Sequence, residues 1–517
     1  MSLIVNGTEI ENVIFNGTEL TELVFNGVKV WEKATGGTKG LVYAPVTASS
    51  TQTIYKVASG ATFDSTYTYF NYNIETNKFN VVNVSTDAEI QGLYYIASTD
   101  ATAPEETGFY CIIDYVGSDK EIKITKSQNN NIIKAVNFND FTNKSQVTKI
   151  IVEAEIIELS ANAFSGYTLL GNIDLPNTLE RIGARPFNET ALYNNEANWS
   201  NGLLKLKTYL VGAKSNLTVA NIDEDVTVCA LSLFNQCLLE TINFNAINMH
   251  DLSGSIFAYG TNAYNQDVGF DTSYPVTTFN IGSKVKRLPS YILYSGRGVT
   301  MSSGTYGGFI GGIRPQGNFL VNTNIEELGQ RCFWGRSVTN NTTWKNITES
   351  SPLIIPSSIK SLAEYVGAGT VRDSPPHYKI ETNYLSENMF NSSQNSSTSL
   401  DSNPATVILN DKITKIPKKC FFKVWSLTSL TIPKNVSVIE NLAFSYDGGS
   451  NRITTLRFEQ PAGMAVTLPT AGSGTGMCYC KTATATTIYT DNETIKNYAW
   501  STDNITATIY HLDGSAW

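Results

Sequence analysis

The feature that most constrains the fold is a pattern of apolar residues that repeats every 23 positions. Each copy contains an apolar-x-apolar triplet, two more apolar residues three apart, and a small residue followed by Phe. Copies in register begin near residues 147, 170, 407 and 430, and partial copies lie between them. A fixed period in the twenties predicts a solenoid, in which each repeat forms one coil that stacks on the next.

Within a coil, the apolar-x-apolar triplet, such as Ile150 and Val152, predicts a strand that stacks about 4.8 Å from its neighbours. Pro176, Pro356 and Pro433 follow such triplets, where the missing N–H ends the strand. The small-Phe pair is expected to fill the interior of the coil. The predicted core column consists of Phe164, Phe187, Phe234, Phe333, Phe421 and Phe444.

The pattern resembles the BspA-like bacterial leucine-rich repeat family. Its consensus, apolar-x-Ile-Pro-x-x-Val-x-x-Ile-x-x-x-Ala-Phe, is matched at residues 430–444 (LTIPKNVSVIENLAF). The resemblance covers about residues 147–517, and it implies an adhesion or protein-recognition surface rather than an enzyme. Such arrays commonly finish with a strand, a short helix and a last strand, which residues 488–512 fit.

The first 31 residues contain a second repeat, with a period of ten and Asn-Gly at positions 6–7, 16–17 and 26–27. Asn-Gly is the strongest short signal for a β-hairpin. Such small hairpins bury little apolar surface, so Phe15, Phe25 and Trp31 are expected either to attach the chain to another protein or to complete an ordinary N-terminal sheet. This repeat resembles short modules of tail-associated structural proteins of bacteriophages.

We therefore predict a mostly β protein in four parts. Only 16% of the residues are charged, while Gly (38) and Tyr (26) are plentiful, a composition that favours strands and turns. The predicted parts are β-hairpins for virion attachment at 1–33, a β-sandwich or barrel-like domain at 41–140, an interrupted leucine-rich-repeat solenoid at 141–480, and a C-terminal βαβ-like cap at 481–517.

Segments rich in Gly, Asn, Ser, Tyr and Trp interrupt the solenoid. Insertions in repeat proteins map to loops on one face, and this composition is typical of recognition loops. Tyr306, Phe309, Trp334 and Trp344 are therefore candidate ligand contacts, unless these loops pack against neighbouring subunits. The insertions lie at about 194–201, 245–275, 294–320, 334–350, 367–404 and 459–477.

Charge and residue usage argue against several kinds of site. The net charge of −9 is unfavourable for binding nucleic acid or inserting into an anionic membrane. The three His are far apart, and none of the seven Cys forms a CxxC pair, so we predict no metal and no cofactor. Cys332 and Cys420 occupy the small core position. Cys478 and Cys480 are either a metal-binding pair or buried thiols.

No catalytic motif is present, and we predict that the chain is not an enzyme. No export signal follows Met1, which together with the decamer repeat favours a bacteriophage virion structural protein that binds the host surface. It would be assembled in the bacterial cytoplasm, bind other virion proteins through its N-terminus and a host glycan or protein through the solenoid, and form a homo-oligomer. The alternatives are a bacterial cell-surface adhesin and a glycan depolymerase.

Overall fold

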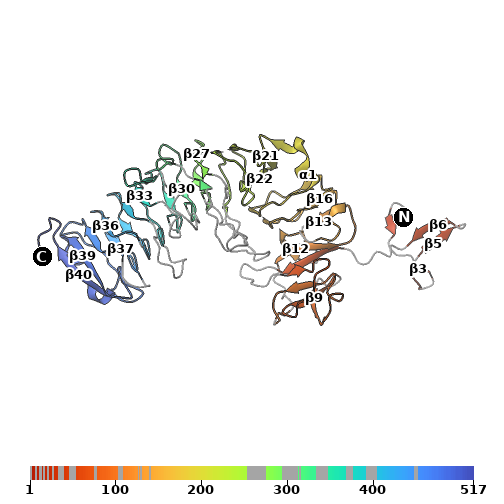
Figure 1. The fold of residues 1–517 in the computed structure, drawn as a ribbon, viewed down its shortest axis with the longest axis horizontal. Helices are drawn as coiled ribbons and strands as arrows, with labels where there is room; N and C mark the ends of the chain where they lie inside the picture. Colours follow the sequence, from red (N-terminus) through yellow and green to blue (C-terminus); the bar gives the residue numbers. More distant parts are fainter. Residues whose placement is uncertain are drawn as a thin grey trace.

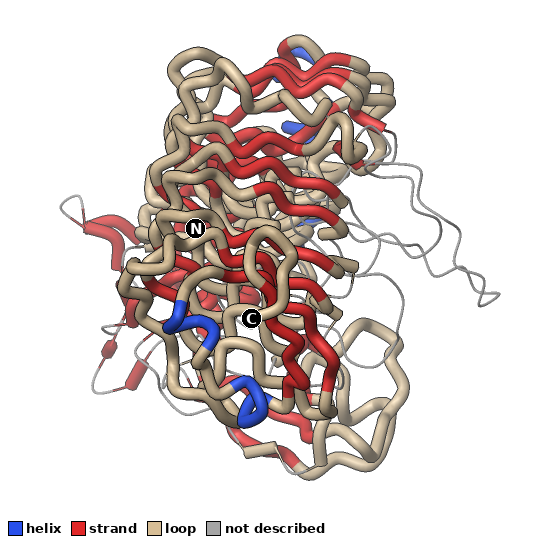
Figure 2. The backbone as a smooth tube through the Cα atoms, turned by 90° about the vertical axis from the view of Figure 1, so that its left-hand side faces the viewer, coloured by secondary structure: helices blue, strands red, loops and turns tan. Residues whose placement is uncertain are grey.

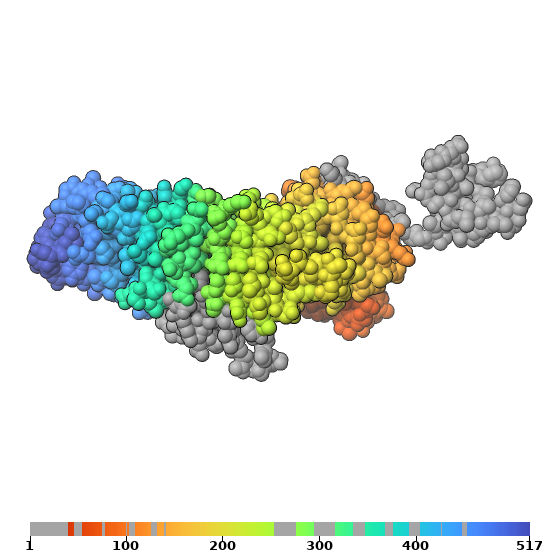
Figure 3. Space-filling view, turned by 90° about the horizontal axis from the view of Figure 1, so that it is seen from above, coloured from red at the N-terminus to blue at the C-terminus, as the bar shows by residue number. Residues whose placement is uncertain are grey.

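The computed structural model contains an elongated β-solenoid whose coils follow one another in sequence order along the long axis (Figures 1 and 3). Before residue 33 only the backbone of the strands is described. The described residues are 3–5, 8–10, 14–15, 18–19, 22–25, 28–32, 40–45, 54–74, 78–99, 101–102, 109–125, 127–128, 131–138, 141–252, 275–293, 312–313, 316–333, 347–367, 376–391, 404–424, 426–446 and 452–517.

Strands of successive coils pair in parallel along the solenoid (Figure 2). Sheets of three- to seven-residue strands alternate in the chain with sheets of two-residue strands. Lys149 pairs with Asn172 in one pair of neighbouring strands. Lys415 pairs with Val438 in another, and both offsets equal the period of 23 expected from the sequence. The prediction of a mostly β protein built on a solenoid of stacked coils is confirmed.

The longer parallel strands are β13 (Glu121–Ile124), β16 (Lys149–Val152), β18 (Asn172–Asp174), β23 (Val219–Ile222), β25 (Thr241–Phe244), β27 (Thr278–Ile281), β31 (Leu353–Ile355), β33 (His377–Ile380), β34 (Thr406–Ile408), β36 (Ser429–Ile432), β38 (Thr455–Phe458), β39 (Thr484–Thr490) and β40 (Ile505–Tyr510). The two-residue parallel strands are β17 (Glu158–Leu159), β19 (Arg181–Ile182), β24 (Val228–Cys229), β26 (Pro275–Val276), β28 (Arg287–Leu288), β29 (Gly312–Ile313), β30 (Glu327–Leu328), β32 (Ser361–Leu362), β35 (Lys415–Ile416) and β37 (Val438–Ile439).

Among the described residues, helices are few and short. They are η1 (Lys144–Gln146), α1 (Ala191–Asn194), η2 (Glu196–Asn198), α2 (Glu493–Lys496) and η3 (Trp500–Asp503). An antiparallel insertion consists of β20 (Trp199–Ser200), β21 (Leu203–Leu206) and β22 (Tyr209–Ala213), and β22 continues in parallel into β24.

Aromatic rings stack from coil to coil in the interior. All six predicted core Phe side chains are buried, each with at most 1% of its surface exposed. Phe164 stacks on Phe187 with ring centroids 5.5 Å apart. Phe421 stacks on Phe444 at 5.9 Å. In four of these six coils the residue before the ring is a small one, Ala or Cys, which leaves room for the ring in the close-packed interior.

Three of the strands between residues 40 and 136 share a sheet with the solenoid. β7 (Gly40–Pro45) is antiparallel to β12 (Phe109–Val116), which pairs in parallel with β15 (Asn131–Val136) and so continues into β17 and β19. In β12, Tyr110 packs into the solenoid core, whereas Cys111 faces a second, antiparallel sheet. Parallel stacking therefore begins upstream of residue 141, the border expected from the sequence, because one sheet belongs to both parts. The sandwich or barrel predicted for 41–140 is not confirmed as a separate unit.

The second sheet in this region has the order β10–β9–β11–β8. Its strands are β8 (Tyr55–Lys56), β9 (Thr68–Asn73), β10 (Lys78–Val82) and β11 (Tyr94–Ile96), and β14 (Ser127–Gln128) pairs separately with β15. Tyr67 stacks on Tyr95 at 4.8 Å. The aromatic residues of this region thus pack on one another.

The N-terminal strands form three antiparallel pairs. They are β1 (Leu3–Val5) with β2 (Thr8–Ile10), β3 (Ile14–Phe15) with β4 (Thr18–Glu19), and β5 (Glu22–Phe25) with β6 (Val28–Glu32). The Asn-Gly steps lie outside the described residues, so the turns predicted at them stay a prediction.

At its C-terminal end the solenoid has a strand–helix–strand arrangement, β39–α2–β40. The buried carboxylate of Asp503 accepts hydrogen bonds from the backbone N–H of Gly472 (2.7 Å) and Cys478 (3.0 Å), and from the hydroxyl of Tyr498 (2.9 Å). A Cβ at Gly476 would lie 1.7 Å from this carboxylate. The Gly-rich segment near residue 474 is therefore shaped to fit Asp503.

Candidate functional site

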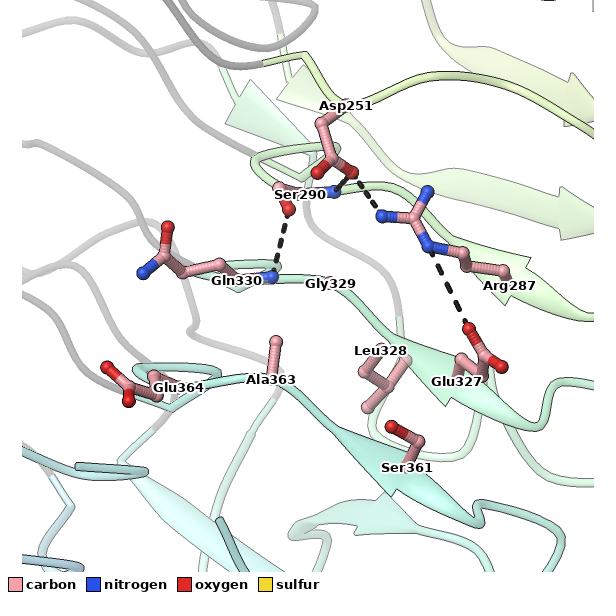
Figure 4. A pocket seen from close by; sticks show the side chains of 10 residues that line it. All are labelled: Asp251, Arg287, Ser290, Glu327, Leu328, Gly329, Gln330, Ser361, Ala363 and Glu364. Atoms are coloured by element: carbon pink, nitrogen blue, oxygen red, sulfur yellow. Dashed lines mark hydrogen bonds and ion pairs between the residues drawn. The ribbon is translucent and has the colours of Figure 1, made fainter. Parts of the chain in front are cut away.

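Three neighbouring coils, at β28, β30 and β32, form a polar hollow of about 320 Å³ (Figure 4). Backbone hydrogen bonds hold these coils in register, since Gly329 N–H donates to Leu288 (2.9 Å) and Ala363 N–H donates to Leu328 (3.0 Å). Each short strand is followed by a turn, so equivalent turn residues lie side by side. The lining residues are Asp251, Arg287, Ser290, Glu327, Leu328, Gly329, Gln330, Ser361, Ala363 and Glu364.

The coils approach one another closely in the floor of the hollow. A Cβ at Gly329 would lie 2.3 Å from the backbone nitrogen of Ser290, so this position has to be glycine. The next residue, Gln330, donates its backbone N–H to the hydroxyl of Ser290 at 3.0 Å. The buried polar groups of the floor are thus paired within the protein.

Arg287 joins two carboxylates at the rim (Figure 4). It forms a hydrogen-bonded ion pair with Asp251, and its Nε lies 4.0 Å from Glu327. Burial raises the pKa of Asp251, but the hydrogen bonds from Ser290 and Arg287 and the charge of Arg287 outweigh this and hold the pKa below its usual value. Asp251 is therefore a fixed, ionised acceptor.

A stack of one cation and two aromatic rings lies beside the hollow. The guanidinium carbon of Arg331 is 5.9 Å from the ring centre of Tyr291 and 5.4 Å from that of Tyr365. Arg331 Nη1 also donates to the hydroxyl of Tyr291 at 3.1 Å. Each of the three residues directly follows a residue that lines the hollow. The contacts hold their side chains in a fixed array.

The same three residues have left-handed backbone conformations, with φ angles of 62° at Tyr291, 52° at Arg331 and 59° at Tyr365. For an L-residue this conformation costs about 1–2 kcal/mol. Hydrogen bonds between coils offset it, as where Tyr291 N–H donates to the carbonyl of Gln330 at 3.1 Å. No sequence signal marked this column, although each member directly precedes a buried apolar residue, which is Ile292, Cys332 or Val366. Equivalent residues in other coils are Asn162, Arg185, Ser232, Asn388, Lys419 and Leu442.

The four predicted ligand-contact residues, Tyr306, Phe309, Trp334 and Trp344, lie outside the described residues. The segments that contain them begin directly after Leu293 and Phe333. Leu293 N–H donates to the carbonyl of Cys332 at 3.2 Å, so both segments start in adjacent coils, within a few residues of the hollow. Their ligand role stays a prediction.

The predicted attachment residues Phe15, Phe25 and Trp31 lie on β3, β5 and β6. Their side chains are not among the described ones, so their attachment role stays a prediction too. No described residue joins them to the hollow.

The cysteines are buried. Cys332 and Cys420 lie in the core, and burial raises the pKa of both thiols. Cys478 and Cys480 are also buried, as expected for structural thiols, and the Cys480 thiol donates to the carbonyl of Cys478 at 3.1 Å. Within the described part of the chain, no group of His, Cys, Asp and Glu has the arrangement of a metal site. No helix there is long and apolar enough to span a membrane.

Comparisons with known proteins agree with the repeat pattern. The model of the BspA type leucine-rich repeat region matches residues 134–265 and 340–453, in six copies. A search of curated proteins found no significant match. The matched regions do not include residues 1–33, so the resemblance of that repeat to phage tail proteins stays a prediction.

Solved structures of leucine-rich repeat proteins overlap with this chain at low identity. A leucine-rich repeat protein from Bacteroides ovatus ATCC 8483 is 14% identical, covers 79% of this chain and 97% of its own, and has a TM-score of 0.29. The pneumococcal vaccine antigen PcpA is 11% identical over 79% and 95%, with a TM-score of 0.27. A leucine-rich cell surface protein from Faecalibacterium prausnitzii A2-165 is 13% identical over 77% and 91%, with a TM-score of 0.17. The sequence match over residues 134–265 and 340–453, together with the 23-residue coils, shows that these two regions consist of repeats similar to the BspA-type leucine-rich repeat.

Proposed function

We propose that this chain is an adhesion protein that binds a cell-surface ligand at the hollow and the insertions beside it. The observation behind the proposal is that three features coincide in adjacent coils. These features are the polar hollow, the Tyr291–Arg331–Tyr365 stack, and the start of two insertions rich in Tyr, Trp, Gly and Asn. Binding surfaces of repeat proteins commonly form where insertions gather on one face.

The chemistry of the site favours a ligand with many hydroxyl or amide groups. Asp251, Arg287 and Glu327 offer fixed charged hydrogen-bonding groups, and Gln330 and Ser361 offer neutral ones. Charge-assisted hydrogen bonds are stronger than neutral ones and require defined geometry. We therefore expect the ligand to be a surface glycan or a surface protein.

The test is binding of the fluorescently labelled full chain to candidate cells, measured by flow cytometry. Arg331→Ala removes the centre of the stack and should weaken binding at least about tenfold, as loss of an Arg anchor commonly does. Lys419→Ala is the matched control, because Lys419 has the same left-handed conformation in a coil outside the hollow. Equal binding of the two variants would refute this site.

A second comparison concerns the insertions. Replacing residues 294–311 by a short Gly-Ser linker should lower binding, whereas the same replacement of 392–403, another insertion of the solenoid, should not. Treating the cells with periodate or with protease then separates a glycan ligand from a protein ligand.

The location proposed first is the bacterial cell surface, and the second candidate is a virion. The decamer repeat at residues 1–33 favours the virion, because three small hairpins with apolar triplets suit docking to a larger assembly. Antibody labelling of intact bacteria and mass spectrometry of washed virions distinguish the two. For the virion candidate, deleting residues 1–33 should abolish incorporation and leave the solenoid folded.

The third candidate, glycan depolymerisation, requires one carboxylic acid that stays protonated to donate to the leaving group. The lowered pKa of Asp251 makes it unsuited to that role. Release of new reducing ends from capsule or wall glycan by the purified chain would establish this activity instead.

A further inference from the structure

A buried ion pair joins the second sheet, β10–β9–β11–β8, to the sheet that continues into the solenoid (Figure 1). Lys56 on β8 donates from its Nζ to Oδ2 of Asp114 on β12, 58 positions away in the sequence. The side chain of Asp114 is 1% exposed and that of Lys56 is 16% exposed. The two charged groups thus meet where solvent has almost no access.

A β-bulge in β12 directs Asp114 toward this lysine. The pairing of β12 with β7 shifts between Ile112 and Asp114, so β12 contains one extra residue there. Ile113 packs toward the second sheet, and Asp114, the next residue, contacts the same sheet instead of the opposite side. Bulges commonly redirect a side chain in this way. The bulge therefore places a carboxylate in the apolar interface between two sheets.

Both oxygens of the Asp114 carboxylate have fixed partners. Oδ2 accepts hydrogen bonds from Lys56 Nζ and from the hydroxyl of Tyr94, the latter at 2.7 Å. Oδ1 accepts from the backbone N–H of Tyr115 at 2.8 Å. Lys56 Nζ also donates to Oγ1 of Thr142 at 3.0 Å. These contacts hold Nζ close to the carboxyl carbon, Cγ.

Burial favours replacing this ion pair by an amide bond. Two buried charges have a desolvation cost that a neutral amide does not have. Reacting groups held in place act as if present at an effective concentration on the order of 10⁵ M or more, which favours condensation. The amide would keep a donor beside Thr142 and an acceptor beside Tyr115 N–H. The exposed pair Lys123–Glu153, by contrast, stays solvated and charged.

We infer that Lys56 and Asp114 form an intramolecular isopeptide bond between Nζ and Cγ. A proton passes from Nζ to Oδ2 along their hydrogen bond, and the nitrogen lone pair then forms the bond to Cγ. The N–H of Tyr115 stabilises the negative charge that develops on Oδ1. The Cγ–Oδ2 bond breaks, and Oδ2 leaves as water with two protons that were on Nζ, while Tyr94 donates a hydrogen bond to it and is unchanged.

One ammonium and one carboxylate thus give one amide and one water, and no other reactant is consumed. The bond closes a covalent loop that contains β9, β10 and β11. It therefore ties the second sheet to β12, and through β12 to the sheet that continues into the solenoid.

The test is the intact mass of the purified full chain, measured in denaturant. The wild type should be lighter than its sequence by one water molecule, and its tryptic digest should contain a branched peptide that joins Lys56 to Asp114. Lys56→Met should have its full sequence mass. Lys123→Met is the matched control, because Lys123 forms an exposed ion pair, and it should still be one water lighter than its own sequence.

Asp114→Asn gives a second readout. Attack of Lys56 on the Asn carboxamide releases ammonia in place of water and gives the same cross-linked product, so this variant should reach the mass of the cross-linked wild type. A wild type with its full sequence mass refutes the inference. A loss of water that persists in Lys56→Met refutes it as well, because the loss then belongs to another residue.

Discussion

The stack of rings inside the solenoid gives a quantitative prediction for Phe421→Ala. Phe421 is 1% exposed and lies between Phe390, with ring centroids 5.2 Å apart, and Phe444, at 5.9 Å. The interplanar angles of 17° and 21° make both contacts stacked. Removing the ring therefore leaves a cavity in the middle of a continuous column.

The expected cost is about 3–5 kcal/mol in the free energy of unfolding, the usual range for a buried Phe replaced by Ala. Phe421→Leu is the control, since it keeps most of the volume and loses mainly the two ring contacts, each worth about 0.5–1.5 kcal/mol. Each coil contacts only its neighbours, so the loss should concentrate in the coils of Phe390, Phe421 and Phe444.

Urea unfolding measures the total change, and hydrogen exchange followed by mass spectrometry locates it. Protection should fall in peptides covering residues 376–391 and 404–446 and stay unchanged around Phe164, many coils away. A loss below about 1 kcal/mol for Phe421→Ala, or an equal loss of protection around Phe164, would show that the column does not stabilise the solenoid by local stacking.

Three further predictions concern single side chains. Hydrogen bonds from Lys286 and Lys360 lower the pKa of Glu326 from 4.5 to about 2. The stabilisation from this carboxylate is therefore present above pH 4.5 and is lost as the pH falls toward 2. Glu326→Gln should lower the melting temperature at neutral pH but not at pH 2, and the effect should shrink in high salt. Asp503→Asn brings an amide N–H toward three donors and should destabilise the C-terminal end by about 1–3 kcal/mol in urea unfolding. Lys419→Ile, β-branched at a φ of 55°, should destabilise by about 1–2 kcal/mol, whereas Lys419→Asn should be neutral.

Much of the candidate site could not be predicted from the sequence. The aromatic insertions were identified by composition, and the structure places the start of two of them in adjacent coils. Asp251 and Arg287 form an ion pair because their coils are neighbours. They are 36 positions apart in the sequence because an insertion of irregular length separates those coils. A pattern search at the fixed period of 23 does not connect such residues. Arg331 was equally hidden, since its neighbours Tyr291 and Tyr365 lie in other coils.

The sequence by itself determined the solenoid, because a 23-residue apolar period leaves each coil with one face that only the next coil can bury. It also determined the Phe column and the buried place of Cys332 and Cys420, since these follow from position within the repeat. Only the tertiary structure decided which charges meet, and that β7, β12 and β15 share a sheet with the solenoid. These contacts depend on which residues become neighbours when coils of unequal length stack, and the local sequence does not encode which residues those are.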